Sequence, residues 1–245
     1  MTPDIQPFGV LHIGVDNYFT INKNTRAGGG SFPTDVGLTM GVLPFEKLQM
    51  EVGIDYLQPE NWVDTGRGKF QVSPFAFNAK VGSPENAWFK ESPALYIGYF
   101  GGGFAHHNVP SNLTSLDTFY ATIGKTIPYI GRISVGPYIG NSRSLVNGYG
   151  NKDNTGWMVA FDRGFFPVKD KEGKDEYNRI ALAADYASGN NVIGGGGVGV
   201  YYYLTKDISL LTGPVWFNEQ DINGKWKWTI QLDINVDVFS KLFSK

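Results

Sequence analysis

The sequence predicts an all-β fold, a closed antiparallel up-and-down transmembrane β-barrel of about 12 strands. Three observations predict it. Apolar and polar residues alternate without exception from Trp226 to Val238, weaker copies of this pattern recur along the chain, and the connections between them differ in length. Successive strand residues point to opposite faces of a sheet. A closed sheet with polar residues inside turns its apolar face outward, where lipid accommodates it.

The alternation defines the expected strands in order. In the first, Leu11, Ile13 and Val15 lie on one face, and His12 and Asp16 lie on the other. The expected strands cover residues 11–16, 36–42, 48–56, 75–81, 94–100, 119–127, 132–140, 157–162, 180–186, 198–204, 208–217 and 226–238. Each is long enough to be a strand, and the twelve are spread along the whole chain.

The connections fall into two sets. Short ones, at 43–47, 127–131 and 205–207, alternate with long ones at 22–33, 59–69, 101–117 and 141–154. In an up-and-down barrel, alternate connections lie at opposite ends, so one end has turns and the other has loops. Three connections break the pattern. Segments 83–92 and 164–178 are long at the short-turn end, and 188–192 is brief at the other. The charged segment 164–178 is expected to be a solvated, mobile excursion.

Composition excludes several classes of function. The chain has no cysteine, so a disulfide or a thiolate metal site is impossible, and its formal charge of −2 argues against nucleic-acid binding. No run of about 18 apolar residues is present, which excludes a transmembrane helix. The first residues lack a basic segment followed by an apolar one, so we expect a mature domain whose signal peptide has been removed.

The alternating strands, the polar inner faces and the unequal ends together resemble Gram-negative outer-membrane β-barrels of the porin-like type. The resemblance covers roughly residues 7–238 of a single domain spanning 1–245, with a short tail at 239–245. It implies a bacterial outer-membrane location, periplasmic termini, extracellular long loops, and a monomer surrounded by bilayer lipid, lipopolysaccharide or detergent. One departure is the tail itself, because family members commonly finish on an aromatic residue.

Aromatic residues near strand ends are expected to form a girdle at the lipid interface. The candidates are Tyr56, Trp157, Tyr186, Trp216, Trp226 and Trp228. The alternative is that aromatic residues simply favour strands.

The inward face carries the candidate functional residues. The proposed lumen lining comprises His12, Asp16, Glu51, Asp55, Lys80, Arg132, Asp162, Asp185, Lys227, Asp233 and Asp237. Acids outnumber bases, so an open lumen would favour cations. The alternative is that these charges pair and fill the interior. Because the first and last strands must meet, Asp16, Asp233 and Asp237 are expected to form an acidic strip near His12.

Large inward aromatic residues are expected to cover the many inward glycines, with a stacking path for a sugar or aromatic solute as the alternative. The residues concerned are Tyr96, Phe100, Tyr120, Tyr138 and Tyr201.

The pattern favours a channel for passive passage of small polar solutes or cations. A closed-lumen barrel whose loops contact partners is the alternative, and a lipid-modifying enzyme or a soluble β-barrel is disfavoured. No serine lies within two residues of His12, and Asp16 is about 13 Å further along the same face. That distance is too long for a catalytic triad. We therefore expect no catalytic residue, no metal site and no cofactor.

Overall fold

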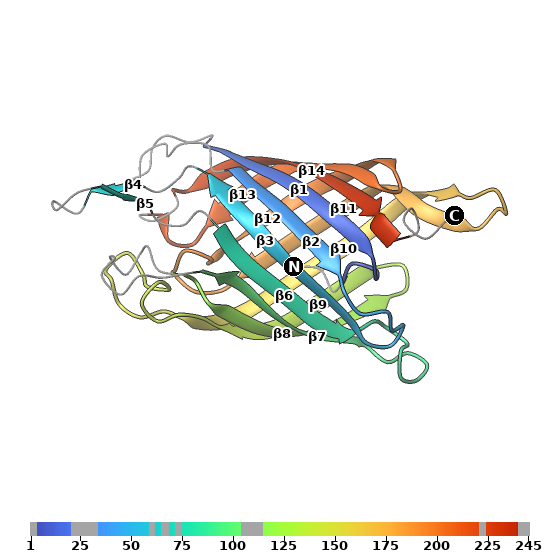
Figure 1. Cartoon of the computed structure of the whole chain (residues 1–245), viewed down its shortest axis with the longest axis horizontal. Helices are drawn as coiled ribbons and strands as arrows, with labels where there is room; N and C mark the ends of the chain where they lie inside the picture. Colours follow the sequence, from blue (N-terminus) through green and yellow to red (C-terminus); the bar gives the residue numbers. More distant parts are fainter. Residues whose placement is uncertain are drawn as a thin grey trace.

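The computed structural model describes residues 4–20, 34–58, 62–64, 69–71, 75–103, 115–220 and 224–239. Twelve antiparallel strands close into one barrel, and a separate two-stranded sheet lies beyond one end (Figure 1). This confirms the predicted fold class and strand number. The described part contains no helix that is long and apolar enough to cross a membrane.

The strands that close the barrel include all twelve expected segments, most of them extended by a few residues. They are β1 (Val10–Thr20), β2 (Thr34–Gly41), β3 (Gln49–Gln58), β6 (Phe75–Ser83), β7 (Ala94–Gly102), β8 (Thr118–Ile127), β9 (Gly131–Ile139), β10 (Thr155–Lys169), β11 (Asp175–Ala187), β12 (Gly195–Thr205), β13 (Ile208–Phe217) and β14 (Trp226–Asp237). The two-stranded sheet consists of β4 (Trp62–Asp64) and β5 (Lys69–Gln71), in the region of the long connection expected at 59–69.

The barrel closes between its first and last strands. Strand β1 pairs with β14 along its whole length, with Val15 opposite Leu232 and Asp16 opposite Gln231. Its other edge pairs with β2. Across most of these pairs apolar residues face apolar residues, as at Leu11 and Val236, so one register suits both faces of the sheet.

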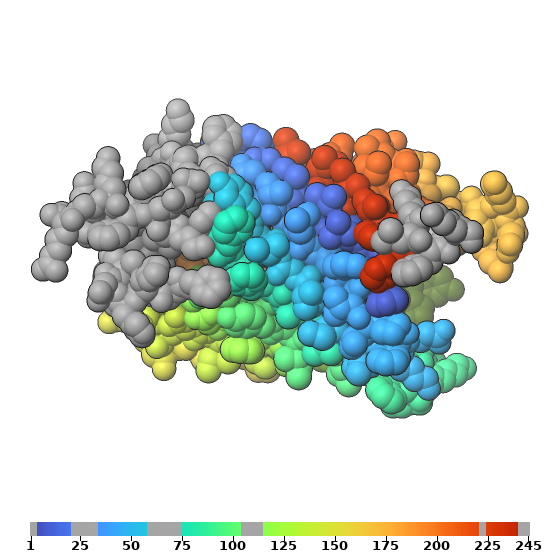
Figure 2. All heavy atoms as spheres, viewed as in Figure 1, coloured from blue at the N-terminus to red at the C-terminus, as the bar shows by residue number. Residues whose placement is uncertain are grey.

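Exposure distinguishes the two faces. The outward side chains of Ile97 and Ile139 are 59% and 55% exposed, whereas the inward side chains of Ser134 and Thr229 are only 3% and 4% exposed. A water-soluble protein would reverse this distribution, because burying apolar area is the main gain on folding. The outer wall is thus an apolar surface, and in Figure 2 the strands form a closed wall on the face shown.

The two ends of the barrel differ as the sequence predicts. The turns between β2 and β3, β8 and β9, and β12 and β13 share one end, here called the short-turn end, with the beginning of β1 and the end of β14. The described termini meet there, because Val238 N donates a hydrogen bond to Gly9 O at 2.9 Å.

The segment 164–178, expected to be a solvated, mobile connection between strands, is mostly strand. Strands β10 and β11 continue as a hairpin that projects beyond the short-turn end (Figure 1), with Phe165 opposite Ile180 and Val168 opposite Tyr177. Only residues 170–174 form its turn. The charged composition suggested a loop, but cross-strand pairing with β10 holds residues 175–180 in a ladder although their sequence does not alternate.

Candidate functional site

The barrel lumen is the candidate site, and the pairing of the strands places the proposed lining residues on its wall. His12 and Asp16 lie on β1, and their cross-strand neighbours on β14 are Asn235 and Gln231. The other members of the predicted lining lie on β3 (Glu51, Asp55), β6 (Lys80), β9 (Arg132), β10 (Asp162), β11 (Asp185) and β14 (Lys227, Asp233, Asp237). Asp237 lies opposite Val10 and is exposed at the end of its strand.

Several of these charges are paired across neighbouring strands. Lys80 Nζ lies 2.8 Å from Glu51 Oε1, and Arg132 Nε donates to Asp162 Oδ1 at 2.8 Å. The Lys80 and Glu51 side chains are only 13% and 12% exposed, so their charges stabilise each other away from bulk water. These residues form a charge-compensated layer near the short-turn end of the lumen.

Three carboxylates nearer the long-loop end lack such compensation. Asp16 lies directly opposite Asp35, and Asp55 lies opposite Gly37, two residues along the same face from Asp35. Asp55 accepts a hydrogen bond from Asn78 Nδ2 at 2.8 Å. No lysine, arginine or histidine of the described residues forms an ion pair with any of the three. We call Asp16, Asp35 and Asp55 the acidic cluster.

Sequence reasoning missed Asp35. It lies one residue before the expected start of its strand, although its alternation with Gly37 and Thr39 was a sufficient signal for the inward face. Its Oδ1 atom is buried and has no hydrogen-bond partner among the described residues. Like charges directly opposite each other on adjacent strands destabilise a sheet, so this pair is not explained by stability.

The strand pairing places Asp16, Asp233 and Asp237 on adjacent strands as expected, with Asp233 opposite Gly14, between the levels of His12 and Asp16. His12 Nε2 lies 3.4 Å from Asp233 Oδ1, and His12 Nδ1 lies 2.9 Å from Asn235 Oδ1. Asp233 thus has a local partner, and Asp237 lies at the rim. The acidic residues also extend to the other side of β1, because the register brings Asp35 of β2 and Asp55 of β3 near the level of Asp16.

A segment outside the strands enters the lumen at the short-turn end. We call residues 4–9 the N-terminal strap. Arg132 Nη1 and Nη2 donate to Asp4 Oδ1 and Oδ2 at 2.7 and 2.6 Å, and Gln6 N donates to Glu51 Oε2 at 2.7 Å. Ile5 is only 9% exposed. The strap therefore contacts the inner wall at both ion pairs of the compensated layer.

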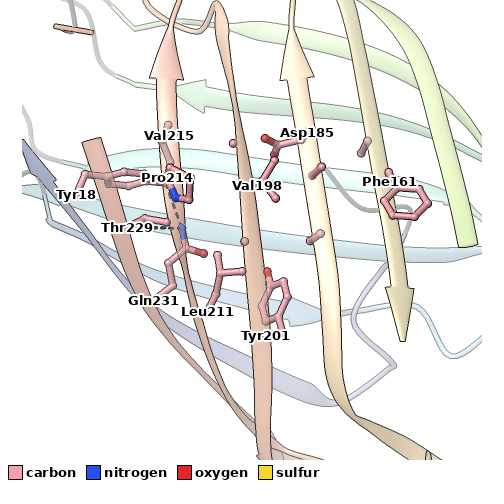
Figure 3. Close-up of a pocket in the computed structure, with 15 residues that line it drawn as sticks. Tyr18, Phe161, Asp185, Val198, Tyr201, Leu211, Pro214, Val215, Thr229 and Gln231 are labelled. Atoms are coloured by element: carbon pink, nitrogen blue, oxygen red, sulfur yellow. Dashed lines mark hydrogen bonds between the residues drawn. The ribbon is translucent and has the colours of Figure 1, made fainter. Parts of the chain in front are cut away.

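Two adjoining cavities of about 330 and 390 Å³ lie against the inner wall of β10 to β13. They share Tyr18, Asp185 and Val215 as lining residues. Small residues such as Ala183 and Gly199 leave this space. In Figure 3, Tyr18, Asp185, Tyr201, Leu211 and Gln231 surround the first cavity, and Gln231 Nε2 donates to the Tyr18 hydroxyl at 3.2 Å.

Loops cover part of the lumen at the long-loop end. Tyr138, Leu145 and Met158 form a buried apolar cluster, with Leu145 fully buried on the loop between β9 and β10. The Tyr138 hydroxyl donates to Ser188 O at 2.6 Å and accepts from Asn191 Nδ2 at 3.0 Å. Loop residues from two different connections are thereby held over the wall beside the second cavity.

Most inward aromatic residues pack against the wall rather than line a path. Tyr96 and Tyr138 are each 3% exposed. A Cβ added to Gly98 would lie 2.1 Å from Tyr120 Cζ, so the absence of a side chain at Gly98 makes room for the Tyr120 ring. Of this set, Phe100 and Tyr201 line the cavities.

The predicted girdle residues lie near the long-loop end of their strands. The rings of Trp216 and Trp226 pack at 5.8 Å between centroids, and Trp228 Nε1 donates to Thr212 Oγ1 at 2.7 Å. Tyr56 is paired with Phe75, and Trp157 and Tyr186 are 59% and 42% exposed. At the opposite end, Trp88, Phe89 and Tyr129 are exposed on turns, where a search restricted to strands does not find them.

Ser209, Asp233 and His12 lie close together, but their contacts are not in the order of a catalytic triad. Ser209 Oγ donates to Asp233 Oδ2 at 3.3 Å, and His12 approaches the other oxygen of the same carboxylate. A serine nucleophile needs its hydroxyl against the histidine, with the carboxylate behind the ring. Here the carboxylate lies between the other two groups.

Solved structures with a similar fold are known, although no family model and no curated protein sequence matches the chain. An outer membrane channel from Pseudomonas putida F1 aligns with a TM-score of 0.49 and 10% identity, over 95% of this chain and 97% of that chain. An outer membrane phospholipase dimer with bound calcium from Salmonella typhi gives 0.47 and 14%, over 96% and 93%. A chain from a study of in-meso crystallisation of membrane proteins gives 0.50 and 10%, over 93% and 83%.

The fold is that of an outer-membrane β-barrel. Likeness at this level of identity shows the fold alone, and a fold does not assign an activity. The function of this barrel has to be argued from its lumen.

Proposed function

We propose that this chain is a monomeric porin-like channel of the bacterial outer membrane that passes small polar solutes and prefers cations. The acidic cluster carries the proposal. Asp16 and Asp35 face each other directly inside a closed barrel, and no cationic side chain of the described residues pairs with either. A passing cation offsets the repulsion between such carboxylates, whereas an anion increases it.

The cavities support passage along one side of the lumen. They lie against the small-residue wall of β10 to β12, and both are bordered by Asp185 and by Tyr18, which is two residues from Asp16 along the same face of β1. Small polar solutes find hydroxyl, amide and carboxylate groups there, beside apolar surface. The interior is therefore partly filled by paired charges and partly open, between the two alternatives that the sequence allowed.

Conductance of the folded protein in planar lipid bilayers tests the proposal. We expect stepwise ion-conducting events, and a reversal potential under a potassium chloride gradient that favours K⁺ over Cl⁻. Heat-modifiable migration in detergent gels shows that the protein is folded. If folded protein gives no conducting steps, the channel is rejected in favour of the closed-lumen alternative. Preference for Cl⁻ would reject the role of the acidic cluster while leaving the channel in place.

A further inference from the structure

The N-terminal strap and the Arg132 side chain together reach across the lumen. Counted around the ring in either direction, β9 is six positions from β1, so Arg132 lies on the wall opposite the strand that the strap precedes. Residues 7–10 form a turn in which Val10 N donates to Pro7 O at 3.0 Å, and the strap then passes Gly41 of β2 and Glu51 of β3 before Asp4 meets Arg132. Twelve strands spaced about 4.8 Å apart enclose a barrel about 18 to 24 Å wide, depending on tilt. Through the long Arg132 side chain, the strap thus connects opposite sides of the short-turn mouth.

The strap leaves the wall at a defined turn. Gly9 has φ +79°, a conformation that favours glycine, and it reverses the chain from β1 into the mouth. Gly41 of β2 lies directly beside the strap, since a Cβ there would be 2.1 Å from Pro7 O. A single parallel bridge between Phe8 and Gly41 is the only strand-like contact of the strap among the described residues. At Gly9 the strap is attached to the barrel by backbone hydrogen bonds with Gly41 and Val238. Nearer its start it is held by the side chains of Glu51 and Arg132.

Both charged wall residues that hold the strap keep a partner when it leaves. Arg132 remains paired with Asp162 at 2.8 Å, and Glu51 remains paired with Lys80 at 2.8 Å. Releasing the strap therefore leaves no buried charge uncompensated, which is the usual large cost of breaking such contacts. Asp4 is itself 63% exposed. The docked and released arrangements are both electrostatically satisfied, as a two-state element requires.

Docking also changes the charge of the mouth. With the strap in place the layer contains three carboxylates (Asp4, Glu51, Asp162) and two cations (Lys80, Arg132), a net charge of −1. Without Asp4, two carboxylates face two cations and the net charge is zero. The docked strap narrows the mouth and makes it less favourable for anions.

We propose that the N-terminal strap is a tethered gate across the short-turn mouth of the lumen, held in place by the Asp4–Arg132 contact, and that it limits conductance and anion passage there. The inference rests on the proposed channel function. It assigns to Asp4, a residue outside the barrel wall, a direct effect on permeation.

The experiment compares wild-type protein, Asp4→Asn and a form lacking residues 4–8. We expect two conductance levels in wild type and only the higher level in the deletion. Asp4→Asn raises the ratio of high-level to low-level dwell time about fivefold, which corresponds to about 1 kcal/mol at 1.4 kcal/mol per factor of ten. It also lowers the preference for cations. Glu46→Gln, an exposed acid in a turn at the same end, serves as the matched control and leaves the ratio unchanged.

A cysteine reporter measures docking without conductance. The chain has no cysteine, so Ile5→Cys introduces a single thiol at a buried strap position. A charged methanethiosulfonate reagent should label it slowly in the otherwise wild-type chain, and several times faster with Asp4→Asn added. Equal labelling rates, or equal conductance in wild type and the deletion, overturn the gate. Lack of conductance in every form overturns the channel function instead.

Discussion

Replacing Asp35 with asparagine separates a functional carboxylate from a structural one. The substitution keeps the size of the side chain and removes the charge that directly opposes Asp16. We expect the substitution to make the barrel more stable and to make the channel less selective for cations. A carboxylate retained for stability would show the first effect with the reverse sign.

The magnitudes follow from charge separation. Relieving the repulsion between directly opposite like charges is worth about 0.5 kcal/mol of unfolding free energy. For permeation, a unit charge in water contributes about 1 kcal/mol at 4 Å and about 0.5 kcal/mol at 8 Å. Cation and anion feel opposite signs, so losing one carboxylate lowers the cation-to-anion permeability ratio by about 5-fold at 8 Å and about 30-fold at contact. Salt near 0.1 M, with a screening length of about 10 Å, reduces both values.

Two assays read these effects. Reversal potentials under a potassium chloride gradient give the permeability ratio, and urea unfolding in lipid vesicles gives the stability. Asp233→Asn is the matched control, because this carboxylate contacts His12 and Ser209 and its loss should lower stability. The reasoning fails if Asp35→Asn destabilises the barrel as Asp233→Asn does, or if the permeability ratio does not change.

Two further predictions concern packing and pH. Gly98→Ala places a Cβ 2.1 Å from Tyr120 Cζ and should cost about 2 kcal/mol by overpacking, and adding Tyr120→Ala should recover part of that loss in the same unfolding assay. Burial opposes ionisation of Glu85, but hydrogen bonds from Thr126 N and Oγ1 at 2.8 and 2.6 Å, and the charge of Lys125, hold its pKa below the ordinary value of 4.5. The folded-state pKa is the lower one, so this contact stabilises the protein fully above pH 4.5 and less as the pH falls through the folded-state pKa. Wild type should therefore lose more stability than Glu85→Gln between pH 6 and pH 3, and parallel pH profiles would contradict the assignment.

The sequence alone determined the architecture, because alternation of side chains is a local property of each strand. Once Ile97 and Ser134 are assigned to opposite faces, closing the sheet decides which face meets lipid. The same argument placed Asp16, Asp55 and Lys80 inside. It ended two strands too early at 164–178, where cross-strand pairing continues the ladder through a charged segment that composition alone assigned to a connection.

Only the tertiary structure decided which inward charges meet. The register between neighbouring strands brings Asp35 opposite Asp16 and pairs Arg132 with Asp162. It also places the Asp233 carboxylate 3.4 Å from the His12 ring. A sequence pattern fixes the face of a residue but not its neighbour, since sliding a strand by two residues preserves every face and changes every contact. The strap across the mouth has no alternating pattern at all, and its place follows from the contact between Asp4 and a strand on the opposite wall.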